Sequence, residues 1–317
     1  MKSMKRKILN EVLSHRPDGP LYHYTKQAGF LGIIRSKQIW ATHTQYLNDT
    51  REFLHAVQVL RKELTLSRAA HGDETVRDVI GAMDSGLPAP QVTNDEKRAA
   101  LREMWESVSN AAEVARINVC VASFSEIRDS LSQWRAYAPR GGFCIGFGGD
   151  RLAQLVVAHG FYLAPCLYDR DEQQRLVRAL IEEVLEENIE RQRQANPVSH
   201  YLPPGGNLRA YLNCYSPILK DPSFAEECEW RIISSPQMCS GSQFDFREGN
   251  SMLIPFYRFP LHGEAGPPHA RAIPLEEVVV GPTPDPERSA ASVRNFLVSQ
   301  GHEEVKVTCS AVPYRDW

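Results

Sequence analysis

Several sequence patterns that identify well-known classes of protein are absent from this chain. It has no phosphate-binding loop GxxxxGK[ST], no dinucleotide fingerprint GxGxxG, no zinc-protease motif HExxH and no nucleophile motif GxSxG. Its ten histidines are scattered without the spacing of metal ligands, so we expect no metal site. No apolar run approaches the roughly 20 residues that span a bilayer, so we expect no membrane contact.

Cysteine pairs of the CxxC type are also absent, and the number of cysteines, seven, is odd. They are Cys120, Cys144, Cys166, Cys214, Cys228, Cys239 and Cys309. The charged segment 1–19 is predicted to be an N-terminal leader, and it lacks the apolar core of a signal peptide. We therefore expect reduced thiols and a cytoplasmic location.

The composition is that of an ordinary globular protein, with 42% hydrophobic and 24% charged residues over 317 positions. A net charge of -3 gives no global attraction to nucleic acid or membranes. We expect a single domain, 1–317, with a core at 20–315 and loop-rich insertions at 70–96 and 195–210, where Gly, Pro and Asn gather.

Hydrophobic periodicity predicts an α+β protein. Helical spacing of apolar residues is found at 26–37, after YLNDTREF (46–53), around 101–108, and at 130–138, 173–194 and 288–300. Strands are predicted at 21–24, 39–42, 117–125, 143–147, 229–234, 252–259, 277–281 and 304–309. Because strands and helices do not alternate strictly, we expect a largely antiparallel or mixed sheet with flanking helices.

The first group of residues that can carry chemistry is His23-Tyr24-Thr25. On a strand His23 and Thr25 share one face, while Tyr24 points the other way. A histidine beside a hydroxyl provides donors and acceptors suited to a sugar diol. The structural alternative is a half-buried histidine followed by a threonine that caps the next helix.

The second group lies in SFSEIRDSLSQWRAYAPRGGF, where Ser123 and Ser125 end a strand. Trp134 and Tyr137 supply flat apolar surfaces suited to a nucleoside ring, and Arg128 and Arg135 are suited to phosphate. Alternatively, Trp134 fills the core and both arginines are solvated.

The third group is FAEECEWRII, in which Glu227, Glu229 and Arg231 would share one face of a strand. Two carboxylates that lie close together raise each other's pKa unless a cation intervenes, and Arg231 is placed to do so. A glutamate at the mouth of a cleft can stabilise an oxocarbenium-like sugar cation. The alternative is a ladder of surface charges.

Together these groups resemble the motifs of ADP-ribosyltransferases. LYHYTKQAGFLGIIRSKQIWAT (21–42) resembles the first motif of the diphtheria-toxin-like and poly(ADP-ribose)-polymerase-like enzymes. The matching positions are His23, Thr25, Phe30, Gly32, Ile33, Ile34 and Ile39. VASFS and EECEW resemble the Ser-x-Ser strand and the Glu-x-Glu signature of the arginine-modifying transferases. A His-type first motif and a Glu-x-Glu third motif usually belong to different branches.

The resemblance implies an ADP-ribosyltransferase-like split sheet and a site for NAD. His23 and Thr25 would hold a ribose, and Tyr24 or Tyr137 would stack on the nicotinamide ring. Ser123 and Ser125 would shape the site.

The two glutamates would carry the reaction. Glu229 would bond the 2'-hydroxyl of the nicotinamide ribose and stabilise the cation formed as nicotinamide leaves. Glu227 would orient or deprotonate an acceptor, which is a protein, a nucleic acid or a small molecule. Our leading hypothesis is an NAD-dependent ADP-ribosyltransferase acting as a toxin or phage-defence effector, with NAD hydrolysis as a variant.

Most of 20–315 also resembles a bacterial family of uncharacterised domains, through YHYT, YLNDTREF, SFSEIRDSLSQWRAYA, GFCIGF and EECEWRII. No transferase role matches four residues of the YLNDTREF segment: Asn48, Asp49, Arg51 and Glu52. Two interpretations are open: these side chains line the same cleft, or Asp49 and Arg51 form a buried structural pair. Two further hypotheses are a non-catalytic domain that binds a nucleotide or peptide, and a metal-dependent hydrolase or nuclease using Asp49, Glu52 and Glu229.

Overall fold

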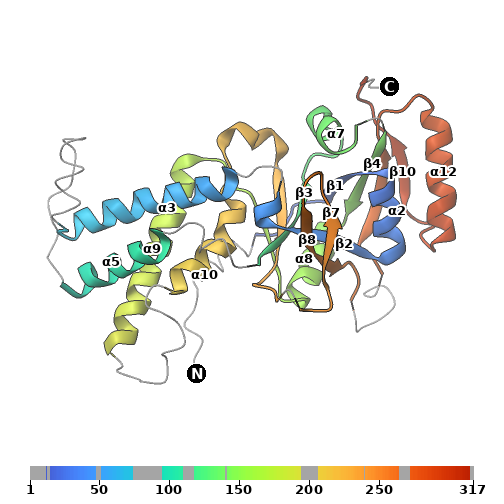
Figure 1. The fold of residues 1–317 in the computed structure, drawn as a ribbon. Coiled ribbons are helices and arrows are strands. Elements are labelled where there is room, and N and C mark those ends of the chain that lie inside the picture. The colour runs from blue at the N-terminus through green and yellow to red at the C-terminus, as the bar shows by residue number, and fades with distance from the viewer. Residues whose placement is uncertain are drawn as a thin grey trace. The chain divides into compact units, whose positions relative to one another are not determined.

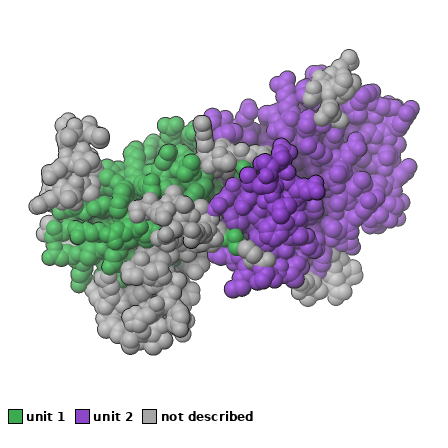
Figure 2. Space-filling model, in the orientation of Figure 1, with its two compact units in different colours: residues 1–12, 47–118, 167–222 green, residues 13–46, 119–166, 223–317 purple. Residues whose placement is uncertain are grey.

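The computed structural model describes residues 12, 15–47, 51–73, 95–109, 118–139, 141–193, 206–238, 240–263 and 272–314. The chain divides into two compact units, each assembled from segments that are distant in sequence. Unit 1 comprises residues 1–12, 47–118 and 167–222, and unit 2 comprises residues 13–46, 119–166 and 223–317 (Figure 2). The domain expected over 1–317 thus contains two units, and the candidate site lies wholly in unit 2.

Unit 2 is built around a ten-stranded sheet (Figure 1). Its strands are β1 (Leu21–Lys26), β2 (Gln38–His43), β3 (Cys120–Ser125), β4 (Gly142–Phe147), β5 (Tyr162–Pro165), β6 (Glu229–Ile233), β7 (Phe244–Glu248), β8 (Leu253–Pro260), β9 (Leu275–Val280) and β10 (Lys306–Cys309). The order is β10-β9-β4-β1-β3-β2-β8-β7, with β6 between β3 and β5. Only the β9–β10 pair is parallel among the described strands, so the sheet is mixed, as expected.

Helices flank this sheet, which confirms the α+β class. They are α2 (Gln27–Ser36), α7 (Leu131–Tyr137), α8 (Gly149–Ala158) and α12 (Pro286–Ser299), with 3₁₀ turns η1 (Thr44–Tyr46) and η4 (Pro222–Glu227). Helix α2 buries Phe30, Ile33 and Ile34, the face that its periodicity predicted. Helix α12 begins at Pro286, after Asp285 whose side chain accepts a hydrogen bond from the amide of Arg288.

Unit 1 is helical in its described residues. It contains α3 (Arg51–Ala70), α5 (Asp95–Ser109), α9 (Arg170–Arg193), α10 (Gly206–Tyr215) and the 3₁₀ turn η3 (Ser216–Ile218). Leu60 and Leu64 of α3 and Met104 of α5 are fully buried, because they recur at helical spacing on the packed faces. The buried carboxylate of Glu63 on α3 pairs with Arg178 on α9 at 3.0 Å.

Parts of the sequence-based outline differ from the structure. The interval 195–210 was expected to be a loop, but residues 206–210 begin α10. Helix α8 and strands β5 and β7 were not predicted. Residues 1–11, 74–94 and 194–205, which make up most of the leader and of the two insertions, lie outside the described residues.

The positions in the YLNDTREF segment are only partly described. Asn48 and Asp49 lie outside the described residues, and the side chains of Arg51 and Glu52 are not described. No helix among the described residues is long and apolar enough to cross a bilayer.

The sheet branches at β3, and this branch creates the site. Val121 pairs with both β2 and β6, and Ser125 pairs with both β1 and β6. Since a strand has only two edges, β1 and β2 must share the edge opposite β6. Residues 122–124 have no ladder partner at that edge among the described strands. The sheet is therefore open along the middle of β3, between β1 and β2.

Candidate functional site

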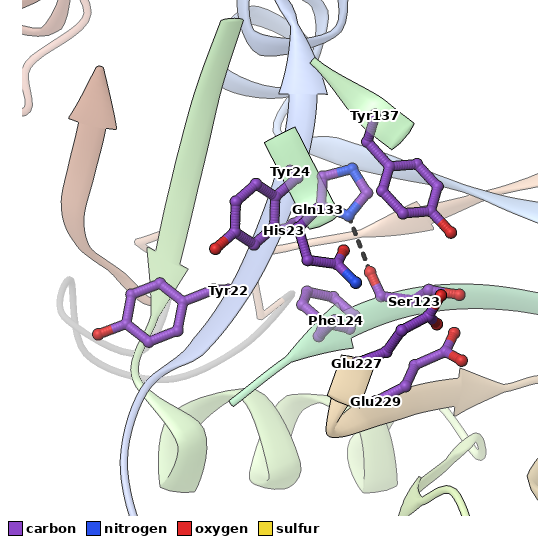
Figure 3. A pocket seen from close by; sticks show the side chains of 9 residues that line it. All are labelled: Tyr22, His23, Tyr24, Ser123, Phe124, Gln133, Tyr137, Glu227 and Glu229. Atoms are coloured by element: carbon purple, nitrogen blue, oxygen red, sulfur yellow. Dashed lines mark hydrogen bonds between the residues drawn. The ribbon is translucent and has the colours of Figure 1, made fainter. Parts of the chain in front are cut away.

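A pocket lies at this opening, with about 340 Å³ of space including its mouth (Figure 3). Its walls come from β1, β3, α7 and the junction of η4 with β6. The lining residues are Tyr22, His23, Tyr24, Ser123, Phe124, Gln133, Tyr137, Glu227 and Glu229. Six of the ten residues predicted from the sequence are thus brought together: His23, Tyr24, Ser123, Tyr137, Glu227 and Glu229.

His23 bridges the open part of the sheet. Its Nδ1 lies 2.9 Å from the carbonyl oxygen of Ser123, a group that has no ladder partner at this edge of β3 among the described strands. A carbonyl can only accept, so Nδ1 carries the proton and Nε2 is left as the acceptor of the neutral ring. Burial lowers the pKa of His23 below its ordinary value of 6.5, and the hydrogen bond to Ser123 only partly opposes this. The ring is neutral at pH 7.

We expect His23 to make the stability of unit 2 sensitive to acid. Between its lowered pKa and 6.5 the unfolded chain binds more protons at this position than the folded chain does. The free energy of unfolding therefore rises with pH through this interval. The stabilising contribution of the neutral His23 side chain is complete above pH 6.5 and is lost on acidification. Urea unfolding of the wild type and of His23→Asn from pH 5 to 8 should show their difference shrinking toward pH 5. A difference that is constant with pH would contradict this account.

Glu229 is held by a bidentate ion pair with Arg231. Arg231 Nε donates to Oε1 at 2.8 Å and Nη2 donates to Oε2 at 2.9 Å. Both residues are buried, with 6% and 3% of their surfaces exposed. The Cys166 thiol also lies 3.7 Å from Oε2. The pair holds Glu229 in one orientation in the wall of the pocket.

Glu227 reaches the pocket by a route that the sequence pattern did not predict. We expected Glu227, Glu229 and Arg231 on one strand face, but β6 begins only at Glu229 and Glu227 ends η4. Between the glutamates, Cys228 has a φ of 41°, in the left-handed region that residues other than glycine rarely adopt. The Ser125 hydroxyl donates to the Glu227 carbonyl at 2.7 Å, which fixes this turn. Ser125 is thus a support of the site rather than part of its wall.

Trp134 does not line the pocket. Of the two interpretations of this residue, a surface for a nucleoside ring or a core side chain, the structure supports the second. Its side chain is fully buried (0% exposed), and its ring contacts Tyr24 edge-on with centroids 4.7 Å apart. The indole N–H donates to Asp129 at 2.6 Å, and Asp129 also accepts from Ser310 and Ala311. Trp134 therefore anchors α7 to the core.

Tyr24 and Tyr137, the two candidates for stacking on a ligand ring, differ in how accessible they are from the pocket. The Tyr24 hydroxyl donates to the carbonyl of Ile127 at 2.7 Å and accepts from the amide of Ser130, so it braces the loop before α7. Burial raises the pKa of Tyr24, which stays a donor at neutral pH. Tyr137, by contrast, is 38% exposed and lies on the pocket wall. Of the two candidates for stacking on a ring, Tyr137 presents the more accessible face.

Arg128 and Thr25 also lie outside the lining. The Arg128 guanidinium pairs with Glu277 at 3.0 Å, and Glu277 additionally accepts from the hydroxyl of Tyr22 at 2.9 Å. The charge of Arg128 is thus already balanced. Thr25 does not cap α2, whose N-cap is Lys26 without a side-chain hydrogen bond. Its hydroxyl instead packs against the first turn of α2, where a Cβ on Gly29 would come within 2.1 Å of it.

Three lining residues were not predicted: Tyr22, Phe124 and Gln133. A signal for Gln133 was present, because it precedes Tyr137 by four positions in a predicted helix. Residues four apart lie on the same face of a helix. If Tyr137 faces a ligand, Gln133 is therefore expected to face it as well.

The described residues contain no group of three or more His, Cys, Asp or Glu side chains arranged to hold a metal ion. Asp49 and the side chain of Glu52, which the metal hypothesis required, are not among them. The six described cysteines are free thiols.

Comparison with known proteins assigns part of this chain to a class. A family model described as "Protein of unknown function (DUF2971)" matches residues 133–232. No curated protein and no solved structure matches the chain. The predicted resemblance to uncharacterised domains is thus confirmed over about a third of the sequence, a part that contains GFCIGF and all but the last residue of EECEWRII but neither YHYT nor YLNDTREF. Four of the nine lining residues fall in the matched part: Gln133, Tyr137, Glu227 and Glu229.

Proposed function

We propose that this pocket binds the nicotinamide end of NAD and that the protein transfers ADP-ribose from NAD to an acceptor. The observation that carries the proposal is the convergence of His23, Ser123 and Glu229, from three distant segments, on one pocket. These are the residues that the resemblance to ADP-ribosyltransferases singles out. The opening of the sheet along β3, between β1 and β2, supports the same assignment, because Ser123 and Phe124 lie in the part of β3 without a ladder partner at that edge and both line the pocket.

The pocket has groups suited to a nicotinamide riboside. Tyr137 offers a partly exposed ring for stacking on the pyridinium, and Nε2 of the neutral His23 is an acceptor for a ribose hydroxyl. The carboxylates of Glu227 and Glu229 place negative charge where the cationic ring and ribose would lie.

The reaction follows from the placement of these charges. The bond between C1' of the ribose and the pyridinium nitrogen breaks, and its electron pair leaves with neutral nicotinamide. Glu229, oriented by Arg231, stabilises the oxocarbenium-like cation at C1' and accepts a hydrogen bond from the 2'-hydroxyl. An acceptor oxygen or nitrogen then bonds to C1', and its proton passes to Glu227. With water as the acceptor the same steps hydrolyse NAD.

Binding of NAD should raise the melting temperature of the wild type, and His23→Ala should reduce the rise. At an NAD concentration 100 times the Kd, the added stability is about 2.7 kcal/mol. Differential scanning fluorimetry with and without NAD measures both effects. The matched control is His262→Ala, which removes a histidine of unit 2 outside the pocket lining and should leave the NAD-dependent rise unchanged. Absence of any NAD-dependent rise in the wild type would count against the proposal.

One observation favours a second candidate, a domain that binds a nucleotide without catalysis. Both oxygens of Glu229 already accept hydrogen bonds from Arg231, as in a purely structural buried ion pair. A binding domain would show the NAD-dependent rise in melting temperature but no release of nicotinamide, so chromatography of the same samples separates the two functions.

A further inference from the structure

Gln133 is a buried amide that has no hydrogen-bond partner among the described residues. It is 6% exposed and lines the pocket. In Figure 3 its side chain extends from α7 toward the space between His23 and Ser123. The amide is not among the fully buried polar atoms that lack a partner, so it is open to the space of the pocket. A polar group held in a pocket wall and open to the pocket is placed to hydrogen-bond a ligand.

The chemistry of this amide specifies the ligand group. A glutamine side chain presents an N–H donor and a carbonyl acceptor side by side, and the complementary group is another amide. The carboxylate of Glu227, which also lines the pocket, disfavours a negatively charged group at this position. A carboxamide is therefore preferred over a carboxylate.

We propose that Gln133 recognises the carboxamide of the nicotinamide ring and so determines the specificity of the pocket for NAD. Its amide N–H donates to the carboxamide oxygen, and its carbonyl accepts from the carboxamide N–H. This inference rests on the proposed function and names the residue that selects the substrate.

The position of Gln133 within α7 supports this role. Gln133 and Tyr137 are one helical turn apart, so one face of α7 presents both an amide and an aromatic ring to the pocket. Trp134, the next residue of α7, is fully buried and is anchored through Asp129 to the segment at Ser310. The helix is thus fixed in place, and the amide is held ready before the ligand arrives.

The test uses three dinucleotides that differ only at the carboxamide. They are NAD, the 3-acetylpyridine analogue, which lacks the N–H donor, and the nicotinic acid analogue, which carries a carboxylate. Calorimetry should show that the wild type binds NAD about tenfold or more tightly than either analogue, as expected for a buried hydrogen bond. Gln133→Leu should weaken NAD binding by a similar factor and remove the difference between NAD and the acetylpyridine analogue.

Two measurements separate recognition from a structural role. Without ligand, Gln133→Leu should melt at about the same temperature as the wild type, because Gln133 makes no hydrogen bond to another described residue, whereas loss of a structural hydrogen bond would lower the melting temperature. Ser132→Ala, on the same helix but outside the pocket lining, should leave all three affinities unchanged.

The outcomes distinguish this inference from the proposed function. If the wild type and Gln133→Leu discriminate equally among the three dinucleotides, the role of Gln133 is overturned while NAD binding stands. If the wild type binds none of them, the proposed function fails and the inference fails with it.

Discussion

Replacing Glu229 with glutamine should lower the rate of nicotinamide release from NAD by at least about 100-fold, the typical effect of removing one group that stabilises transition-state charge. Glutamine keeps the size of the side chain but removes the negative charge opposite the developing cation. The release is measured by chromatography of nicotinamide at saturating NAD. An unchanged rate in a folded variant would exclude the transferase and the NAD hydrolase alike.

The structure shows that this experiment needs a stability control. Glu229→Gln removes a counter-charge from the Arg231 guanidinium, which is only 3% exposed, so we expect the variant to be less stable than the wild type. The double variant Glu229→Gln/Arg231→Met removes both charges and should recover much of this loss without recovering activity. Glu63→Gln in unit 1 is the matched control, because it also removes a buried carboxylate that accepts from an arginine. It should lose stability but keep nicotinamide release per folded molecule.

Trp134→Ala should destabilise the protein by about 3–5 kcal/mol, whereas Tyr137→Ala, three positions along the same helix, should change stability by only about 0.5 kcal/mol. Trp134 is fully buried, packs against Tyr24 and hydrogen-bonds Asp129, so truncation leaves a cavity and removes one of the two hydrogen bonds that Oδ1 of Asp129 accepts. Tyr137 is partly exposed at the pocket. Urea unfolding measures both values.

Substitutions at the same two positions should affect the affinity for NAD in the opposite order: the change at Tyr137 should weaken binding more than a conservative change at Trp134. Tyr137→Ala should weaken NAD binding, because it removes the ring available for stacking. Trp134→Phe, which keeps most of the buried volume, should bind NAD nearly as well as the wild type. Equal effects of the two substitutions on binding would contradict the separation of roles within α7.

The arrangement around Glu229 also explains how one carboxylate can be both buried and functional. Glu229 and Arg231 are two positions apart on β6 and therefore project from the same face. The short link lets the guanidinium fork reach both oxygens and hold the carboxylate in one orientation. Meanwhile the left-handed turn at Cys228 directs Glu227 toward the same pocket from outside the strand.

Much of the secondary structure was accessible from local patterns. The spacing of Phe30, Ile33 and Ile34 predicted α2, and the apolar positions Trp230, Ile232 and Ile233 predicted β6. The same kind of signal was present but overlooked for α8, where Leu152, Leu155 and Val156 recur at helical spacing and are buried. Local periodicity cannot reveal the turn at Cys228, because a left-handed residue that is not glycine persists only when surrounding contacts enforce it.

The sequence by itself determined which residue types were available for chemistry: the histidine on β1, the serine on β3 and the two glutamates before and on β6. Only the tertiary structure decided which of them meet. His23 reaches Ser123, one hundred positions away, because β1 pairs with β3 at only one described position and leaves its middle open. Likewise, the packing of α7 decided that Trp134 faces the core while Gln133 and Tyr137 face the pocket. Such choices depend on long-range strand pairing and helix packing, which no local pattern encodes.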